Sequence, residues 1–598
     1  MISNSSIKRL WLYLAPRRKK QLTLLLVLMV GASLAEMIGI GAVLPFLGAL
    51  ISPEKLFQSK LIQPVIANLN INDPTQLLLP MTLIFIGASV TASVMRLMLL
   101  WAQIRLGHAI GADLSIQIYE KTLYQPYAVH ASRNSSEIIA GISNKVNVVV
   151  LNTVLPLIAA TSSLLLFLGI LTALILIDPV VALAAVLVFG TTYAFIMIFS
   201  RNQLKLNSQL ISREYGRAAK ALHEGFGGIR EVLIDGTQAV YCKIYQSADL
   251  PLRRAQANNQ FIGASPRFLI EALGVVLIAS LAYALTSREG GAVAAIPLLG
   301  ALAIGAQRLL PVLQQLYASW SSLKGSESSL NDVLSLIEQP VPAYALESSI
   351  QPISFKKSIK LKNVSFRYSN QTPNVLEDIN LEIKKGTMVG FMGTTGSGKS
   401  TLLDLVMALF EPGYGSLLID ETLINQRNFR AWQSHIAHVP QAIFLKDANI
   451  AENIAFGVPA EEIDHDRVRQ VAQQAQIAKI IESWAHGYNT CVGERGIRLS
   501  GGQRQRIGIA RALYKPADVI ILDEATSALD NITEAAVIGA INALEKNTTI
   551  LMIAHRLTTL KACDVIYELE AGQIIRQGNY EDIINLTKSA PHQTRSKS

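Results

Sequence analysis

Two kinds of hydrophobic pattern divide the chain of 598 residues. Up to about residue 320, long apolar runs alternate with polar stretches, and each run has the ~20 residues that cross the hydrocarbon core of a bilayer. From residue 357 on, short β-like runs such as IKLKNVSF alternate with helical patterns, as in a soluble α/β domain. The long runs predict six membrane-spanning helices, at about residues 22–50, 77–101, 148–177, 180–199, 261–286 and 292–320.

The polar stretches between these runs predict the orientation of the spans. Lys and Arg gather in residues 1–20, 103–147 and 201–260, while the other loops hold few of them. Because basic loops stay on the cytoplasmic side, both ends of the chain are expected in the cytoplasm. Residues 1–20 are expected to lie as an amphipathic segment at the membrane surface. A short external helix is expected at 56–69.

Composition agrees with a membrane protein. Half of the residues are hydrophobic, only 16% are charged, and the mean hydropathy is +0.34. An ordinary soluble enzyme carries more charge. The formal charge of +9 is explained by the basic cytoplasmic loops, so no nucleic-acid partner is expected. Three cysteines without metal-type spacing make thiol or zinc chemistry a poor explanation.

One stretch of the second half, GTTGSGKST, predicts a phosphate-binding loop. A short apolar β-like run precedes it and a helical pattern follows it, which is the context such a loop requires. Glycines let backbone N–H groups curl around phosphates, the lysine neutralises the β- and γ-phosphates, and the serine hydroxyl binds Mg²⁺. The residues of this loop expected to contact ATP are Gly393, Thr394, Thr395, Gly396, Ser397, Gly398, Lys399, Ser400 and Thr401.

The run VIILDE, residues 519–524, predicts an apolar strand that ends in two acids. Asp523 is expected to hold Mg²⁺ and Glu524 to orient the attacking water. Taken alone, the two acids also fit a helix-capping pair.

A second phosphate-binding feature is LSGGQ at 499–503, followed by the helical pattern RQRIGIARAL. Small residues at a helix start leave N–H groups and a hydroxyl free for a phosphate. With this motif the chain resembles the ATP-binding cassette (ABC) family, whose ATPases carry LSGGQ as their signature. The residues of this motif expected to contact ATP are Ser500, Gly501, Gly502 and Gln503.

The resemblance implies roles for further residues. Tyr368 matches the aromatic residue that stacks on adenine, and Gln441 matches the glutamine that reaches Mg²⁺ and the attacking water. His555 matches the switch histidine at the γ-phosphate, and 527–530 (SALD) matches the loop that crosses the dimer interface. VGERG at 492–496 matches the loop typical of exporters. The metal ligands implied are therefore Ser400, Gln441 and Asp523, and the catalytic residues Glu524, His555 and Gln441.

The implied fold class is an α-helical polytopic membrane domain of six spans, exporter type, fused to an α/β P-loop NTPase domain of the ABC type. The expected boundaries are a membrane domain at 1–320, a linker at 321–356, a nucleotide-binding domain at 357–585 and a disordered tail at 586–598. In this family the phosphate loop of one subunit and the signature of another enclose ATP. A homodimer is therefore expected, in a membrane that the resemblance suggests is the bacterial inner membrane.

The transported substrate has to be inferred from charges inside the spans, namely Glu36, Arg96, Arg267, Glu271 and Arg308. Arg267 and Glu271 are four residues apart and are able to pair on one helix face. Arg96 and Arg308 have no partner nearby in the sequence. The two arginines therefore predict either a basic cavity for an anion or side chains that reach the interface.

Three stretches of the spans, AEMIGIGAVLPF, SPRFLIEALG and AQRLLP, resemble flippases of lipid-linked oligosaccharides and polysaccharide exporters. The resemblance implies that Arg96, Arg267 and Arg308 bind the pyrophosphate of a polyprenyl-diphosphate-linked glycan. The main alternative is an exporter of lipids of the lipid A type or of hydrophobic drugs. A peptide exporter, a cassette ATPase without a transport role and an ATP-gated regulator are weaker alternatives.

Overall fold

The computed structural model divides the chain into two compact units. One unit contains Met1–Gln125 and His130–Pro340, and the other contains Pro126–Val129 and Val341–Ser598. The residues described are 4–583, except 52, 59–62, 64–72, 134–137, 140, 178, 287–290, 343, 345–352, 370, 527–528, 543–546, 555 and 557–558. The expected tail at 586–598 and most of the expected external helix at 56–69 lie outside the described residues.

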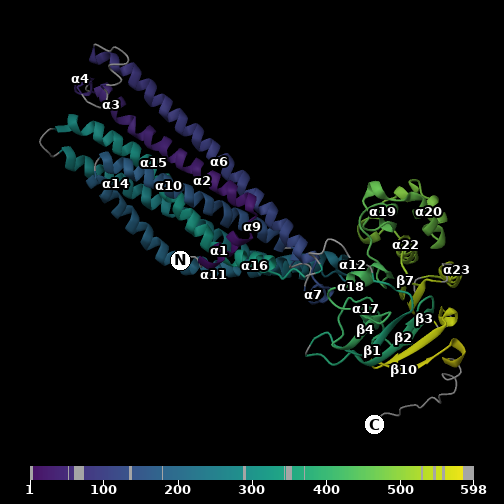
Figure 1. Cartoon of the computed structure of the whole chain (residues 1–598). Helices are drawn as coiled ribbons and strands as arrows, with labels where there is room; N and C mark the ends of the chain where they lie inside the picture. The colour runs from purple at the N-terminus through teal and green to yellow at the C-terminus, as the bar shows by residue number, and fades with distance from the viewer. Residues whose placement is uncertain are drawn as a thin grey trace, which may run out of the picture. The chain divides into compact units, whose positions relative to one another are not determined.

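The first unit is helical, and its long helices run side by side (Figure 1). The longest continue well beyond the length of a membrane span. The helices are α1 (Asn4–Tyr13), α2 (Pro16–Gly41), α3 (Val43–Ile51), α4 (Pro53–Phe57), α6 (Leu78–Leu123), α7 (Tyr127–Ser132), α9 (Val146–Val149), α10 (Leu155–Ile177), α11 (Pro179–Gly227), α12 (Ile229–Ile234), α13 (Gln238–Ala264), α14 (Pro266–Thr286), α15 (Gly291–Gly325) and α16 (Glu327–Ile337). A 3₁₀ turn (η1, Pro74–Leu77) precedes α6, and two π-helical turns, η2 (Gly141–Lys145) and η3 (Val150–Val154), flank α9. α7 lies partly in each unit.

Helices occupy all six positions expected for spans. Among the described residues, three stretches have the length and hydropathy of a membrane span: Pro16–Ile51, Pro74–Leu123 and Gly141–Leu176. The other three expected spans fall on α11, α14 and α15. The fifth span begins later than expected, because α13 ends at Ala264 and Pro266 starts a new helix.

The expected linker at 321–356 differs from the structure. α15 continues to Gly325, and α16 follows it inside the first unit with one fully packed face. Leu10 of α1 and Leu14, which follows that helix, belong to the same buried cluster as α16, while Trp11 and Leu12 of α1 are exposed. The reason is the apolar spacing i, i+3, i+4, i+7, which buries one stripe of a helix. In α16 that stripe is Leu330, Val333, Leu334 and Ile337.

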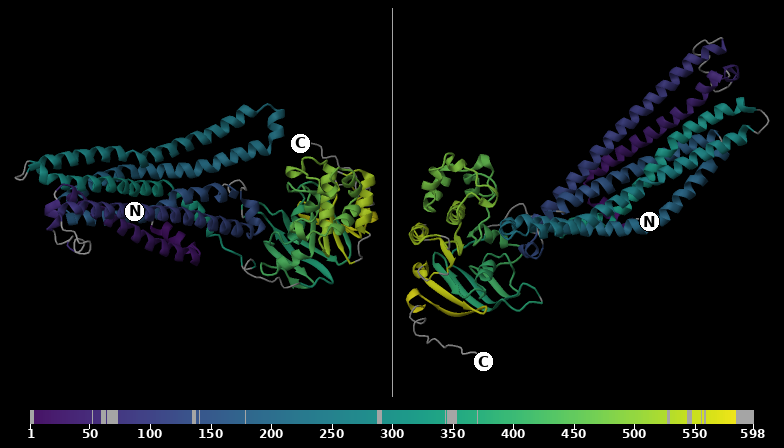
Figure 2. Two further views of the ribbon diagram at one scale, coloured as in Figure 1. Left: turned by 90° about the horizontal axis from the view of Figure 1, so that it is seen from above. Right: turned by 180° about the vertical axis from the view of Figure 1, so that it is seen from behind.

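The second unit contains two sheets, which meet along β2 and β10 (Figure 2). The antiparallel sheet has the order β2-β1-β4-β5 and the other sheet the order β10-β9-β3-β8-β7-β6, parallel except for β10. The strands are β1 (Ser358–Phe366), β2 (Leu376–Lys384), β3 (Met388–Gly393), β4 (Tyr414–Ile419), β5 (Thr422–Leu423), β6 (Ile436–Val439), β7 (Val519–Asp523), β8 (Thr549–Ile553), β9 (Val565–Glu570) and β10 (Gln573–Gly578).

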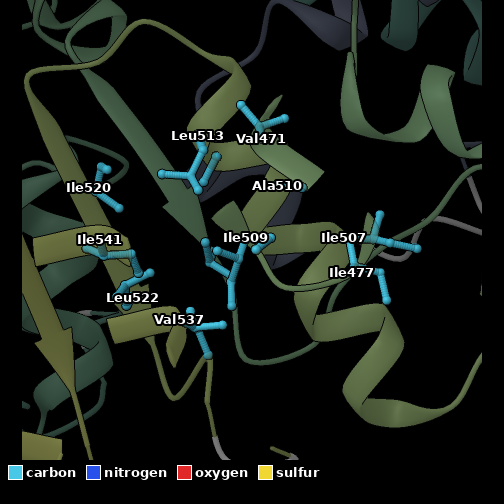
Figure 3. Close-up of a cluster of buried hydrophobic side chains, with 14 of the residues drawn as sticks. Val471, Ile477, Ile507, Ile509, Ala510, Leu513, Ile520, Leu522, Val537 and Ile541 are labelled. Atoms are coloured by element: carbon cyan, nitrogen blue, oxygen red, sulfur yellow. The ribbon is translucent and has the colours of Figure 1, made fainter. Parts of the chain in front are cut away.

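Helices cover this second sheet and carry the remaining motifs. In Figure 3, Ile509 and Leu513 of α22 lie among the buried side chains that also include Ile520 and Leu522 of β7. The packing fixes the helix that begins at the LSGGQ motif against the strand that ends in the two acids. The helices are α17 (Lys399–Val406), α18 (Phe429–Ser434), α19 (Ile450–Ile454), α20 (His465–Gln474), α21 (Ala478–Glu482), α22 (Gly501–Tyr514) and α23 (Asn531–Asn542).

Candidate functional site: a phosphate loop and a charge cluster

The predicted phosphate loop connects the end of β3 to the start of α17. Gly393, Gly396 and Gly398 have φ angles of +145°, +85° and +98°, a region that favours glycine. A Cβ atom on Gly393 would lie 2.1 Å from the carbonyl oxygen of Leu569. The loop therefore depends on glycine for its conformation and for its close approach to neighbouring backbone.

Lys399 is the first residue of α17 and only 7% exposed. Its Nζ donates hydrogen bonds to the carbonyl oxygens of Gly393 (2.9 Å) and Thr394 (2.8 Å). Burial lowers the pKa of this ammonium group, although the nearby carboxylates of Glu524 and Asp523 raise it. The ammonium group is thus folded back onto the loop, where phosphate oxygens are able to replace the carbonyl oxygens.

The two acids lie at the carboxyl end of β7, and ligands of parallel sheets bind beyond the carboxyl ends of the strands. Glu524 has a left-handed backbone (φ +52°), an uncommon conformation for a non-glycine residue. Its carboxylate Oε2 accepts a hydrogen bond of 2.7 Å from Nε2 of Gln441. The hydroxyl of Ser400 donates to Oδ1 of Asp523 over 3.5 Å. The structure therefore brings each predicted acid to one of the predicted polar partners.

The three residues predicted to hold Mg²⁺ fit that ion chemically. Ser400, Gln441 and Asp523 offer a hydroxyl, an amide carbonyl and a carboxylate, which are the oxygen donors that Mg²⁺ prefers. The contact between Ser400 and Asp523 places two of these donors together. When bound with ATP, the ion supplies positive charge for the β- and γ-phosphates.

A further acid beside this site was not predicted. Asp404 lies on α17, and burial together with the charge of Asp523 raises its pKa to about 6. The sequence did contain a signal, because Asp404 is four residues after Ser400 and shares its helix face.

Tyr368 is 53% exposed, and its hydroxyl lies 2.8 Å from the hydroxyl of Thr401 in the phosphate loop. The rings of Phe366 and Phe410 pack against the tyrosine ring in T-shaped arrangements, with ring centroids 5.2 and 5.4 Å apart. These contacts hold an aromatic ring beside the loop while half of it remains accessible, as stacking on a base requires.

The LSGGQ motif forms the start of α22 with a complete capping box. Ser500 Oγ accepts from the backbone N–H of Gln503 (3.3 Å), and Gln503 Oε1 accepts from the N–H of Ser500 (2.8 Å). Ser500 and Gly501 are exposed. The N–H groups of Gly501 and Gly502 are in the first turn, where a helix attracts anions.

The structure describes only some of the remaining predicted residues. His555, Ser527 and Ala528 lie outside the described residues. Asp530 begins the turn before α23, where its Oδ1 accepts from the N–H groups of Ile532 and Thr533. The segment 492–496 is a tight turn with positive φ at three of its five residues. Those three are Gly493, Arg495 and Gly496.

The charges within the spans form two separate groups. Glu36 of α2 is 4% exposed and lies 2.8 Å from Nη1 of Arg308 and 3.3 Å from Nε of Arg96. Arg96 and Arg308 have no partner nearby in the sequence, and the structure gives them a distant one, since Glu36 is 60 and 272 residues away. Arg267 pairs instead with Glu271 on its own helix (2.6 Å), as the spacing of four residues predicted.

Comparison with known proteins agrees with both units. Residues 376–527 match the ABC transporter family, and residues 38–289 match the ABC transporter transmembrane region. A protein of Methylococcus capsulatus named ATP-dependent lipid A-core flippase is 30% identical over 547 residues, which are 88% of this chain and 87% of that protein.

Other matches cover less or show the fold alone. A Saccharophagus degradans protein, also named ATP-dependent lipid A-core flippase, is 43% identical over 230 residues, 38% of this chain and 39% of that protein. The structure of a bacterial Atm1-family ABC exporter with ATP bound is similar over 96% of this chain and 99% of that chain, with a TM-score of 0.76 and 22% identity. The predicted fold class is confirmed. The chain belongs to the ABC transporter family, as a half-transporter in which a helical membrane domain is fused to an ABC ATPase domain.

Proposed function

We propose that this chain is one half of a homodimeric, ATP-driven exporter in the bacterial inner membrane, with both ends in the cytoplasm. ATP is held by the phosphate loop of one subunit and the LSGGQ motif of the other. The proposal is supported by the phosphate loop, the acid pair of β7 and the capped start of α22, which occur in a chain whose other half is a bundle of membrane helices.

In this proposal each residue of the nucleotide site has a stated task. Lys399 exchanges the loop carbonyls for phosphate oxygens, and Tyr368 stacks on the adenine. Gln441 holds the carboxylate of Glu524 in place. Glu524 then accepts the hydrogen bond of the attacking water and orients that water toward the γ-phosphorus. His555 is proposed to contact the same phosphate.

The proposed substrate is an amphipathic lipid with a phosphate group, and the best candidate is a polyprenyl-diphosphate-linked oligosaccharide. The observation that carries this proposal is the convergence of Arg96 and Arg308 inside the spans. Charged side chains are costly there unless they serve a partner or a ligand. Two guanidinium groups among apolar helices suit a phosphate attached to a hydrocarbon tail.

A lipid of the lipid A type is the second candidate. The Methylococcus capsulatus and Saccharophagus degradans proteins both carry the name lipid A-core flippase, and the first aligns over most of both chains. Lipid A also combines phosphate groups with acyl chains, so the arginines suit it as well.

Reconstitution of the purified chain into proteoliposomes tests both candidates. Fluorescent polyprenyl-diphosphate-linked glycan and fluorescent lipid A are incorporated separately, and the fraction that crosses the bilayer is measured with and without ATP. We expect ATP-dependent translocation of the first lipid above that of the second. The reverse order would favour lipid A, and translocation of neither lipid would contradict the proposed function.

A further inference from the structure

The charge cluster in the spans is assembled from three helices. Glu36 lies on α2, Arg96 on α6 and Arg308 on α15. A carboxylate that is 4% exposed is strongly disfavoured unless cations offset its charge. Two guanidinium groups do so, and the cluster retains one net positive charge.

The contacts with Glu36 do not occupy the arginines fully. The closest approach to the carboxylate is through Nη1 for Arg308, at 2.8 Å, and through Nε for Arg96, at 3.3 Å. Each group has five N–H donors in a planar fork that suits a phosphate. The side chains of Arg308 and Arg96 are 33% and 41% exposed, so the helices of this chain enclose neither of them fully.

Glu36 itself is incompletely satisfied. Its Oε2 atom is buried and has no well-aligned hydrogen bond among the described residues, although Arg96 is within ion-pair distance. When Arg96 leaves this carboxylate it therefore breaks a charge attraction but no well-aligned hydrogen bond to Oε2. Arg96 is held more loosely than an arginine in an ion pair with two short hydrogen bonds.

Such a neutral pair exists between two of the same helices. Arg18 of α2 contacts Asp113 of α6 through two hydrogen bonds of 2.8 and 3.0 Å. This pair has one positive and one negative charge, which is sufficient for an ion pair whose role is to hold two helices together. Arg18 and Glu36 are separated by about 27 Å along α2, at ~1.5 Å per residue. The Arg18–Asp113 pair lies in the basic start of α2, whereas the net positive charge of the cluster at Glu36 lies within the span.

We propose that Glu36 is the resident counter-ion of an anion site formed by Arg96 and Arg308, and that it competes with the lipid phosphate for their guanidinium groups. The inference rests on the proposed function, because it concerns the head group of the transported lipid. Competition lowers the affinity of the site, which lets a lipid that has entered leave again. Glu36 is therefore an affinity-setting residue, whereas the arginines contact the substrate.

The test uses the full-length protein in nanodiscs, with farnesyl diphosphate, farnesyl phosphate and lipid A as probes. Binding is measured by microscale thermophoresis for the wild type, Glu36→Gln, and Asp113→Asn as the matched control that removes a carboxylate between α2 and α6. We expect Glu36→Gln to bind farnesyl diphosphate about tenfold more tightly, because one competing charge is gone. The gain for farnesyl phosphate should be smaller, and Asp113→Asn should bind as the wild type does.

Glu36→Asp covers the case in which the glutamine variant does not fold. It keeps the charge, but its shorter side chain cannot reach both guanidinium groups, and we expect about threefold tighter binding. Unchanged or weaker binding of farnesyl diphosphate by a folded Glu36 variant would overturn the role of Glu36 while leaving the proposed function in place. A wild type that binds lipid A but neither farnesyl lipid would assign the site to lipid A. A wild type that binds none of the three would overturn the anion site and the proposed substrate class together.

Discussion

The phosphate loop at 393–401 and the charge cluster around Glu36 are constructed differently. In the loop, backbone conformation sets the geometry: three glycines have positive φ, and Lys399 is held by two carbonyl oxygens of the same loop. In the membrane unit, side chains from three helices make the cluster. The loop is therefore specified by adjacent residues, whereas the cluster exists only when the helices have packed.

The difference has consequences for mutation. A single side chain in the loop can be changed without loss of the shape that glycine maintains, so its chemical role is separable from folding. In the cluster, removal of Glu36 leaves two arginines without their counter-ion, and removal of one arginine leaves Glu36 with a single partner, so binding and packing change together. Substitutions in the ATPase domain can therefore test whether the chemistry of the phosphate loop is separable from its folding. Substitutions of the arginines can test whether the charge cluster depends on partners that are distant in the sequence.

The largest effect is expected from Glu524→Gln. The amide cannot accept the proton of the attacking water, while its size and its contact with Gln441 are retained. We expect ATP hydrolysis to fall by about a hundredfold or more, with nucleotide binding preserved. Phosphate release and binding of a fluorescent ATP analogue measure the two properties. Normal steady-state hydrolysis would remove Glu524 from this role.

Two inactive variants are expected to restore activity when combined. Lys399→Ala removes the positive charge that neutralises the phosphates, and Gly501→Asp places a negative charge at the capped start of α22. If each ATP is enclosed by two subunits, a mixed dimer has one intact site. Co-expression with two different affinity tags, tandem purification and an ATPase assay should show hydrolysis above that of either variant alone. Hydrolysis no higher than that of the single variants would argue against the composite site.

Two glycines of the loop provide a matched pair. A Cβ on Gly398 would lie 2.7 Å from Leu376 Cδ2 and 3.0 Å from the carbonyl oxygen of Val375, whereas a Cβ on Gly396 meets nothing within 4 Å. Both have positive φ, which costs an alanine about 1 kcal/mol. We expect Gly398→Ala to weaken ATP binding at least tenfold and Gly396→Ala to weaken it less. Equal losses in a nucleotide titration would show that the steric contact is unimportant.

The smallest effect is expected from Asp404→Asn. The pKa of Asp404 is raised to about 6 in the folded chain, so its ionisation weakens folding as pH rises from about 4 to 6 and remains unfavourable above that. The amide should stabilise the ATPase domain by about 1 kcal/mol at pH 8, allowing for solvent screening, and have little effect at pH 4. Thermal unfolding without Mg²⁺ or nucleotide measures this. A stabilisation of equal size at both pH values would show that ionisation of Asp404 is not the cause.

The features that could be predicted from the sequence are those that depend on local interactions, whereas most of the features that were missed depend on distant ones. The strand–loop–helix context of Lys399 and the acids at the end of β7 were predicted from adjacent residues, and the structure brings them together. The pairing of Arg96 and Arg308 with Glu36 was not predicted, because it depends on how α2, α6 and α15 pack. α16 was missed although its apolar spacing was visible, since Ser and Pro residues around it suggested a linker. The raised pKa of Asp404 was not predicted, because it depends on the burial of this side chain in the folded domain.

The most direct test of the proposed transport function asks whether the two regions act on one another. ATP hydrolysis by the reconstituted wild type is measured while polyprenyl diphosphate is titrated into the liposomes, and the measurement is repeated with Arg96→Ala plus Arg308→Ala. We expect the lipid to stimulate hydrolysis several-fold in the wild type and to leave the double variant at its basal rate. Equal stimulation of both proteins would contradict the claim that these arginines receive the transported phosphate.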